Sequence, residues 1–260
     1  MNIVVCIKQV PDTTDVKINP ATGTIIREGI PSIMNPDDKG GLELALRLKD
    51  QFGAKVTVIT MGPPLADAIL REAFAMGVDR AILLTDRAFA GADTLATSHA
   101  LAYALNCIDH DLVITGRQAI DGDTAQVGPQ IAEHLGIAQV SYVADAKFDG
   151  KDQFVITKEL EDGYQELEVS TPCLLTVLAS AIKPRYMTVR GIVEAFDKEV
   201  EIWTADSINP VREKLGLKGS PTHVKKSFAK ALKQPGEVME GTPEELVEII
   251  IAKLKEKYII

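Results

Sequence analysis

The polar loop 116–128 contains the residues of this sequence that are best suited to chemistry. It follows the apolar run 111–115 and precedes a helical pattern that continues through Ile131 and Leu135. In a parallel α/β sheet, a loop between a buried strand and a helix presents free backbone N–H groups and the positive end of the helix dipole, which together bind phosphate. The sequence therefore predicts a nucleotide site on this loop.

The residue types of the loop fit that prediction. Gly116 and Gly122 allow a ligand to approach the backbone closely. Gln118 and Gln126 can hydrogen-bond a base edge, a ribose or a ring carbonyl, and Arg117 supplies a cation. The two signature glycine-rich motifs of nucleotide binding, GxxxxGK[ST] and GxGxxG, are both missing from the sequence.

Other interpretations of the same residues stay open. A loop of this composition often only turns the chain, with Asp123 capping the following helix. A metal site formed by Asp37, Asp38, Asp121 and Asp123 is a weaker alternative, and no metal ligand is predicted. Cys6 lies within an expected buried strand, and Cys107 and Cys173 have no base nearby in sequence, so no catalytic residue is predicted either. A protein that holds a redox cofactor needs orientation and electrostatics more than its own acid or base.

Composition excludes several classes of protein. The 260 residues are 46% hydrophobic and 25% charged, as in a globular domain with room for an appended lobe. A net charge of −9 and 5% aromatic residues argue against nucleic acid as a partner. The longest uncharged apolar stretch, residues 173–182, is about half a membrane span, so no membrane insertion is expected. Residues 2–7 resemble a strand more than a signal peptide, and the expected location is cytoplasmic.

The apolar periodicity predicts an α/β fold with a doubly wound, mostly parallel sheet, because strands and helices alternate along the first half of the chain. An added antiparallel hairpin is expected at about 153–170, with its turn at Asp162-Gly163. An extended C-terminal arm is expected to end in a helix that starts at a capping box, residues 242–245. Residues from about 205 onward are polar and are expected to build little core. The expected strands are 2–8, 55–61, 81–85 and 111–116, with a small hairpin at 16–27; the expected helices are 35–53, 66–76, 93–107 and one that stops at Gly136.

The elements bring other residues to the same place. Ligands of open α/β sheets bind beyond the carboxyl ends of the strands. The strand ends at 6–8 and 60–62 should therefore lie beside the loop that starts at Gly116, and the helix start at Asn35 can face the same crevice.

The loop 116–121 resembles the nucleotide loop of the electron-transfer flavoprotein small (beta) subunit. The resemblance extends over residues 5–10, 34–36 and 75–80, and residues 158–176 look like the family signature. Residues 183–187 match the entry to the family's partner-recognition loop, at about 184–198, and Val189 stands at the position of the loop's apolar anchor. A lysine-rich stretch that follows this loop in the family is replaced here by residues 194–199.

The resemblance implies a heterodimer with an alpha subunit that carries one FAD. It divides the chain into a nucleotide-binding α/β domain, residues 1–204, and an arm and helix, residues 205–260, that dock on the alpha subunit. Partner-binding residues are expected at Arg185, Tyr186 and Val189. Strand ends and resemblance together give these candidate cofactor-binding residues: Cys6, Lys8, Asn35, Pro36, Asp37, Asp38, Thr60, Met61, Gly62, Thr115, Gly116, Arg117, Gln118, Ala119, Ile120, Asp121, Gly122, Asp123, Thr124, Ala125, Gln126 and Val127.

The bound nucleotide differs between branches of the family. Members that bind a structural AMP have a bulkier loop after the position of Ile120, whereas Gly122, Ala125 and Arg117 look like the electron-bifurcating branch, where a second FAD replaces AMP. That branch implies an electron carrier which, with its alpha subunit, acts as an NADH-dependent flavin oxidoreductase. One electron would go to ferredoxin or flavodoxin and the other, through the alpha-subunit FAD, to an acyl-CoA dehydrogenase. The alternatives are a non-bifurcating shuttle with AMP and a non-redox nucleotide-binding regulatory protein.

Overall fold

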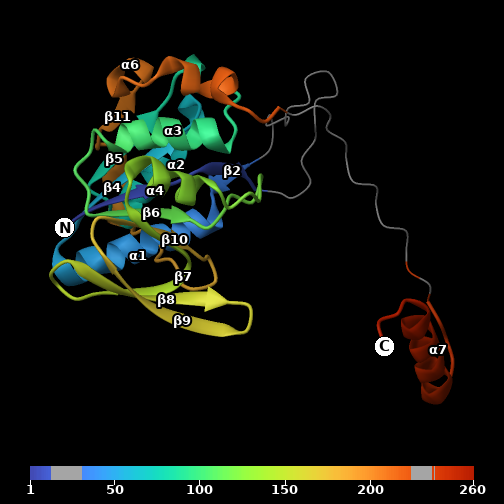
Figure 1. The fold of residues 1–260 in the computed structure, drawn as a ribbon. Helices are drawn as coiled ribbons and strands as arrows, with labels where there is room; N and C mark the ends of the chain where they lie inside the picture. Colours follow the sequence, from blue (N-terminus) through green and yellow to red (C-terminus); the bar gives the residue numbers. More distant parts are fainter. Residues whose placement is uncertain (13–30, 224–235, 237) are drawn as a thin grey trace. The chain divides into compact units, whose positions relative to one another are not determined.

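The computed structural model describes residues 1–12, 31–223, 236 and 238–260 (Figure 1). The hairpin expected at 16–27 lies outside the described residues. The strands are β1 (Asn2–Cys6), β2 (Gln9–Pro11), β3 (Ser32–Met34), β4 (Lys55–Met61), β5 (Arg80–Leu84), β6 (Leu112–Gly116), β7 (Ala138–Phe148), β8 (Gln153–Leu160), β9 (Gly163–Ser170), β10 (Cys173–Val177) and β11 (Val200–Trp203). The α-helices are α1 (Pro36–Phe52), α2 (Asp67–Met76), α3 (Thr94–Leu105), α4 (Val127–Leu135), α5 (Val189–Ala195), α6 (Ala205–Ile208) and α7 (Pro243–Glu256).

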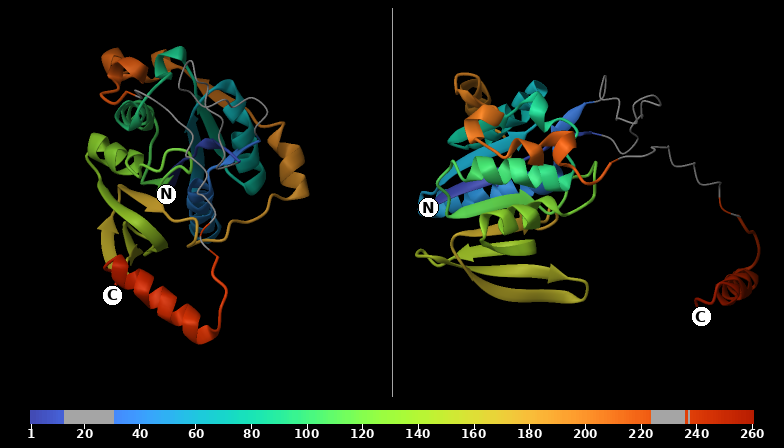
Figure 2. Two further views of the ribbon diagram at one scale, coloured as in Figure 1. Left: turned by 90° about the vertical axis from the view of Figure 1, so that its right-hand side faces the viewer. Right: turned by 45° about the horizontal axis from the view of Figure 1, so that its top comes forward.

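Within the described residues, nine strands form the central sheet in the order β11-β5-β4-β1-β6-β10-β7-β8-β9. Neighbouring strands from β11 to β7 are parallel, and β8 and β9 add an antiparallel hairpin at one edge, which Figure 2 shows continuing the sheet. The chain moves outward from β1 through β4 to β5 and then returns to β6, on the other side of β1. The predicted doubly wound α/β sheet with its hairpin is confirmed.

Helices cover both faces of the parallel part of the sheet. Alternating side chains of β1 show the two faces, because Ile3 and Val5 belong to one core and Val4 and Cys6 to the other. The first core includes buried side chains of α1 and α2, and the second includes those of α3 and α4. The left view of Figure 2 shows these two helix pairs on opposite sides of the sheet. The chain adds strands on one side of β1 and then on the other, so a crevice forms at the carboxyl ends of the parallel strands β1 and β6.

The ends of the predicted helices match their local signals. Helix α1 follows Asn35 with Pro36 in its first turn, and it ends at Gly53, whose φ of 66° allows its N–H to donate to Lys49 O at 2.8 Å. Helix α4 ends in the same way at Gly136, with φ 66°. The small sheet of β2 and β3 and the eleven-residue strand β7 were not predicted from the sequence.

The expectation that little core is built after residue 205 is wrong for the first part of the arm. Ala205, Ile208 and Leu215 are buried in the second core, against side chains of α3 and neighbouring strands. Ser220 is also buried, where its Oγ accepts a hydrogen bond from the N–H of Asp93 at 2.8 Å. The apolar residues of this segment are spaced singly among polar ones, so the average composition conceals them.

Chain contacts define a body, Met1–Ser227, and a terminal unit, Phe228–Ile260. The terminal unit contains α7, which begins with the predicted capping box: Thr242 N donates to Glu245 Oε2 at 2.9 Å, and Glu245 N donates to Thr242 Oγ1 at 3.4 Å. Val247, Ile250 and Ile251 are exposed on this helix. In the part of the chain that the structure describes, no helix combines the length and the apolar character needed to cross a bilayer.

Candidate functional site

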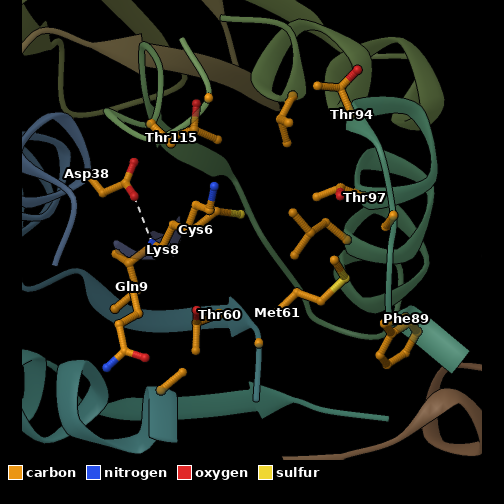
Figure 3. Close-up of a pocket in the computed structure, with 18 of the residues that line it drawn as sticks. Cys6, Lys8, Gln9, Asp38, Thr60, Met61, Phe89, Thr94, Thr97 and Thr115 are labelled. Carbon is orange, nitrogen blue, oxygen red and sulfur yellow. Dashed lines mark hydrogen bonds between the residues drawn. The ribbon is translucent and has the colours of Figure 1, made fainter. Parts of the chain in front are cut away.

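A cleft of about 760 Å³ opens at the carboxyl ends of β1, β4, β5 and β6 (Figure 3). One wall consists of the ends of β1 and β6 and the loop that leads into α4. The other consists of residues after β5 and the start of α3. In the close-up, Cys6, Lys8 and Asp38 lie across the open space from Phe89, Thr94 and Thr97. The volume lies within the range of small-molecule sites, ~300–1,000 Å³.

Most of the candidate cofactor-binding residues line this cleft. They are Cys6, Lys8, Asp38, Thr60, Met61, Gly62, Thr115, Gly116, Arg117, Gln118, Ala119, Gly122, Thr124, Ala125, Gln126 and Val127. The six candidates outside the lining are Asn35, Pro36, Asp37, Ile120, Asp121 and Asp123. The strand ends and the loop therefore meet at the cleft as the sequence predicts, whereas several polar candidates lie outside its lining.

Asn35 is fully buried, and its side chain hydrogen-bonds the backbone of the loop 116–128. Its Nδ2 donates to the carbonyl oxygen of Gln118 at 2.8 Å, and its Oδ1 accepts from the N–H of Ile120 at 3.1 Å. Its side chain makes no capping bond to α1, although it occupies the cap position. The amide that the sequence marks as a helix cap therefore fixes the shape of the loop.

The two carboxylates in the first turn of α1 bind backbone amides from three strand ends. Asp38 accepts from Lys8 N at 2.8 Å and from Gly116 N at 2.9 Å. Asp37 accepts from Ala179 N, just after β10, at 2.9 Å and from Gln118 N at 3.3 Å. Burial raises the pKa of Asp38 to about 7, against the hydrogen bonds that lower it. The start of α1 therefore joins β1, β6 and β10 at the base of the cleft.

The acidic residues of the loop bind neighbours within the protein. Asp121 Oδ1 pairs with Lys8 Nζ at 2.6 Å, and Asp123 Oδ1 accepts from Gln118 Nε2 at 2.8 Å. Asp123 makes no cap to α4, because the cap position of that helix is Gln126, which has no side-chain capping bond. The interpretation of Asp123 as a helix cap is therefore wrong. Each carboxylate is held by a donor, which reduces the repulsion of an anionic ligand.

The lining includes donors suited to a polar ligand. Thr60 is 1% exposed, and its hydroxyl has no hydrogen-bond partner among the described residues. A buried hydroxyl without a partner costs free energy, so this donor fits a ligand that accepts from it. Across the cleft, Asp93 caps α3 by accepting from Ala96 N at 3.0 Å, and Thr94 and Thr97 lie on the first turns of that helix. A second helix N-terminus therefore borders the site.

It was not predicted from the sequence that the segment after β5 and the start of α3 line the cleft. These lining residues are Thr85, Asp86, Arg87, Phe89, Ala90, Gly91, Ala92, Asp93, Thr94, Thr97 and Leu101. The signal was present, since residues 81–85 were predicted as a strand and its carboxyl end had to reach the same edge of the sheet.

The geometry gives no support to cysteine catalysis or to the alternative of a metal site. Burial, with Asp38 adding to it, raises the pKa of the Cys6 thiol to about 12, so Cys6 lines the cleft as an apolar side chain. Among the described residues, no cluster of three or more His, Cys, Asp or Glu side chains is placed to share a metal ion.

The candidate partner residues lie outside the cleft lining. The guanidinium of Arg185 binds Glu43 Oε2 at 2.8 Å and Asp50 Oδ2 at 2.8 Å, which anchors the segment before α5 to α1. Tyr186 is 91% exposed and Val189 is 81% exposed. Both side chains are therefore largely uncovered by the described chain.

Residues 22–208 match the family model described as "Electron transfer flavoprotein domain". The chain belongs to the electron transfer flavoprotein family. It is 60% identical over 260 residues to electron transfer flavoprotein subunit beta of Clostridium acetobutylicum, covering 100% of both chains. It is 52% identical over 263 residues to the caffeyl-CoA reductase-Etf complex subunit CarD of Acetobacterium woodii, again with 100% of both chains covered. The acryloyl-CoA reductase electron transfer subunit gamma of Anaerotignum propionicum is 47% identical over 269 residues, with the same coverage. The resemblance to the small subunit of this family is confirmed.

Proposed function

We propose that this chain is the small subunit of a heterodimeric electron carrier and that its cleft holds an FAD. The observation that carries the proposal is the cleft at the carboxyl ends of β1 and β6. The acidic side chains Asp121 and Asp123 are bound there by donors within the protein, and other donors are available to a ligand. Two helix starts, at α3 and α4, border the same space.

Residues of both walls would hold the cofactor. Backbone N–H groups of the loop and the side chains of Arg117, Gln126 and Thr60 would bind its polar parts. The apolar side chains of Met61, Phe89 and Leu101 would contact its rings. Bound there, FAD would accept a hydride from NADH and supply single electrons. The chain itself binds the cofactor, orients it and excludes water from it.

The acceptors follow from the family's bifurcating branch. One electron would pass to ferredoxin or flavodoxin, and the other, through the alpha-subunit FAD, to an acyl-CoA dehydrogenase. Relatives named as parts of caffeyl-CoA and acryloyl-CoA reductases support an acyl-CoA enzyme as partner. The three cysteines are free thiols, which suits a reducing compartment such as the cytoplasm.

Two sets of exposed apolar side chains would contact the alpha subunit. Tyr186 and Val189 present exposed apolar side chains, and α7 carries exposed Val247, Ile250 and Ile251. Exposed apolar side chains of this kind are a feature of protein interfaces. The arm from residue 205 and the helix α7 would dock on the alpha subunit.

FAD is favoured over AMP by the space available. FAD contains the whole of AMP and adds a second phosphate, a ribityl chain and a three-ring flavin. The cleft continues from the loop past Met61 to the wall after β5, beyond what the adenylate alone would occupy. Gly122 borders the cleft, and a Cβ at this position would meet nothing within 4 Å, so the loop leaves room on that side.

The test is to purify the chain together with its alpha subunit and to quantify the extracted cofactors. About two FAD per heterodimer would support the proposal. One FAD and one AMP would instead support the non-bifurcating shuttle. A colourless complex that contains only an adenine nucleotide would support the regulatory protein.

A further inference from the structure

Tyr142 in β7 has a backbone conformation that such a residue rarely adopts. Its φ is 60°, in the left-handed region, where a bulky side chain is strained. The pairing of β7 is irregular around it: the register with β10 shifts between Leu175 and Val177, and the register with β8 shifts between Val143 and Asp145. The N–H of Tyr142 donates to Thr176 Oγ1 at 3.3 Å. Irregularities of this kind redirect a side chain and are frequent beside functional sites.

The ring of Tyr142 is directed at a residue of the cleft. Arg117 Cζ lies 5.8 Å from the ring centroid, within the range of a cation–π contact. Tyr142 is 42% exposed and belongs to neither apolar core of the body. Core burial therefore does not offset the backbone strain, and the contact with Arg117 is the interaction that the strained conformation makes possible.

Arg117 is held on a second side by Asp37. Its Nε lies 3.4 Å from Asp37 Oδ2 and is buried without a hydrogen-bond partner. Its backbone N–H donates to Val177 O at 2.9 Å, which fixes the start of the loop to β10. Asp37 also accepts from Ala179 N and Gln118 N, so its charge is shared among three donors. Arg117 also lines the cleft, and within the described residues its Nη groups make no hydrogen bond.

We propose that Tyr142 is a positioning residue: the bulge in β7 holds its ring against Arg117 so that the guanidinium binds a phosphate of the nucleotide in the cleft. The inference rests on the proposed function, since it needs a nucleotide there. A guanidinium clamped between a ring and a carboxylate loses less freedom on binding than a free one. Its planar donors match two phosphate oxygens. The ring therefore raises affinity for the phosphate part of the ligand and leaves the adenosine part unaffected.

The experiment uses the heterodimer stripped of the cofactor of the cleft, with ADP and adenosine as probes in calorimetry. Tyr142→Leu removes the ring and should weaken ADP binding by about two- to fivefold, the size of an exposed cation–π contact. Adenosine, which has no phosphate, should bind as to the wild type. Tyr142→Phe keeps the ring and should bind both probes as the wild type does. Arg117→Gln should weaken ADP binding by about tenfold or more, because it removes charge-assisted bonds.

A double-mutant cycle separates positioning from general structure. In the Arg117→Gln background, Tyr142→Leu should cause no further loss of ADP affinity, because the ring acts through Arg117. Tyr142→Gly removes the ring and also the backbone strain, so its melting temperature should be no lower than the wild type's while ADP binding falls. Equal losses for ADP and adenosine in Tyr142→Leu, or additive losses in the cycle, would overturn the inference. Failure of the wild type to bind ADP or FAD would refute the proposed function instead.

Discussion

Gly116 lies where the end of β6 meets the start of α1, and a single methyl group there should separate them. A Cβ at this position would lie 2.6 Å from Asp38 N and 2.7 Å from Asp37 Cβ. Both distances are below any real contact, and the first involves backbone, which cannot move aside as a flexible side chain would. Overpacking of this kind costs ~1–3 kcal/mol. For a chain of this size, Gly116→Ala should therefore lower the melting temperature by roughly 2–12 °C.

Gly122→Ala is the matched control within the same loop. Its added Cβ would meet nothing within 4 Å, and its backbone is not left-handed. Removing a glycine at a compatible position stabilises a protein by ~0.4–1 kcal/mol through the unfolded chain. Thermal unfolding followed by circular dichroism should thus move the two variants in opposite directions. Equal melting temperatures for the two variants would refute the tight contact between β6 and α1.

Three further changes test other parts of the site. Thr60→Val should stabilise the cofactor-free protein by ~1 kcal/mol in urea unfolding, because it removes a buried hydroxyl without a partner, and should speed FAD loss in dialysis. Gly122→Val should release FAD, since it fills space beside the cleft, while the melting temperatures of the cofactor-free variant and the cofactor-free wild type stay equal. His99 and His134 stack at 3.9 Å between α3 and α4, and burial, with nearby Lys214, lowers the pKa of both. The unfolded chain then takes up protons first, so stability should fall as the pH drops through about 6.5, and His134→Gln should flatten that fall.

The results that would contradict these expectations are specific. Unchanged FAD retention in Thr60→Val would mean that the hydroxyl donates to no cofactor. Stoichiometric FAD in Gly122→Val would place the cofactor away from the loop. For the histidine pair, melting curves recorded from pH 8 to pH 5 should differ between wild type and His134→Gln only at the acidic end. Subtracting the two curves cancels the opposite contribution of Asp38, whose raised pKa adds stability as the pH falls through about 7.

The sequence was sufficient to predict the parallel sheet and the edge at which the cleft opens. The near-continuous apolar runs of β1, β4 and β6 identify strands buried on both faces, and their carboxyl ends must meet. The signals that end a helix, Gly53 and Gly136, are local and therefore readable from sequence. Each of these predictions depends on residues close together in the chain.

The interactions that the sequence did not predict join residues far apart in the chain. Asn35 is a good helix cap by its position, yet its side chain bonds to residues more than eighty positions away. The strain at Tyr142 comes from two neighbouring strands whose register changes beside it. Likewise, the buried residues after position 205 have no periodic pattern of their own and are buried through contacts with α3 and neighbouring strands. Local pattern gives the elements, and tertiary contacts decide what each side chain does.

The arrangement of charge is compatible with the proposed anion site in a chain of net charge −9. Lys8 neutralises Asp121, backbone amides bind Asp38, and the first turn of α3 holds Asp93. Each of these acids is thus bound by a donor within the protein. Two buried donors of lining residues, the hydroxyl of Thr60 and the Nε of Arg117, have no hydrogen-bond partner among the described residues, and the start of α4 borders the cleft. Because these donors are fixed before any ligand arrives, a nucleotide would not have to order them on binding, and affinity should depend on them far more than on the net charge of the chain.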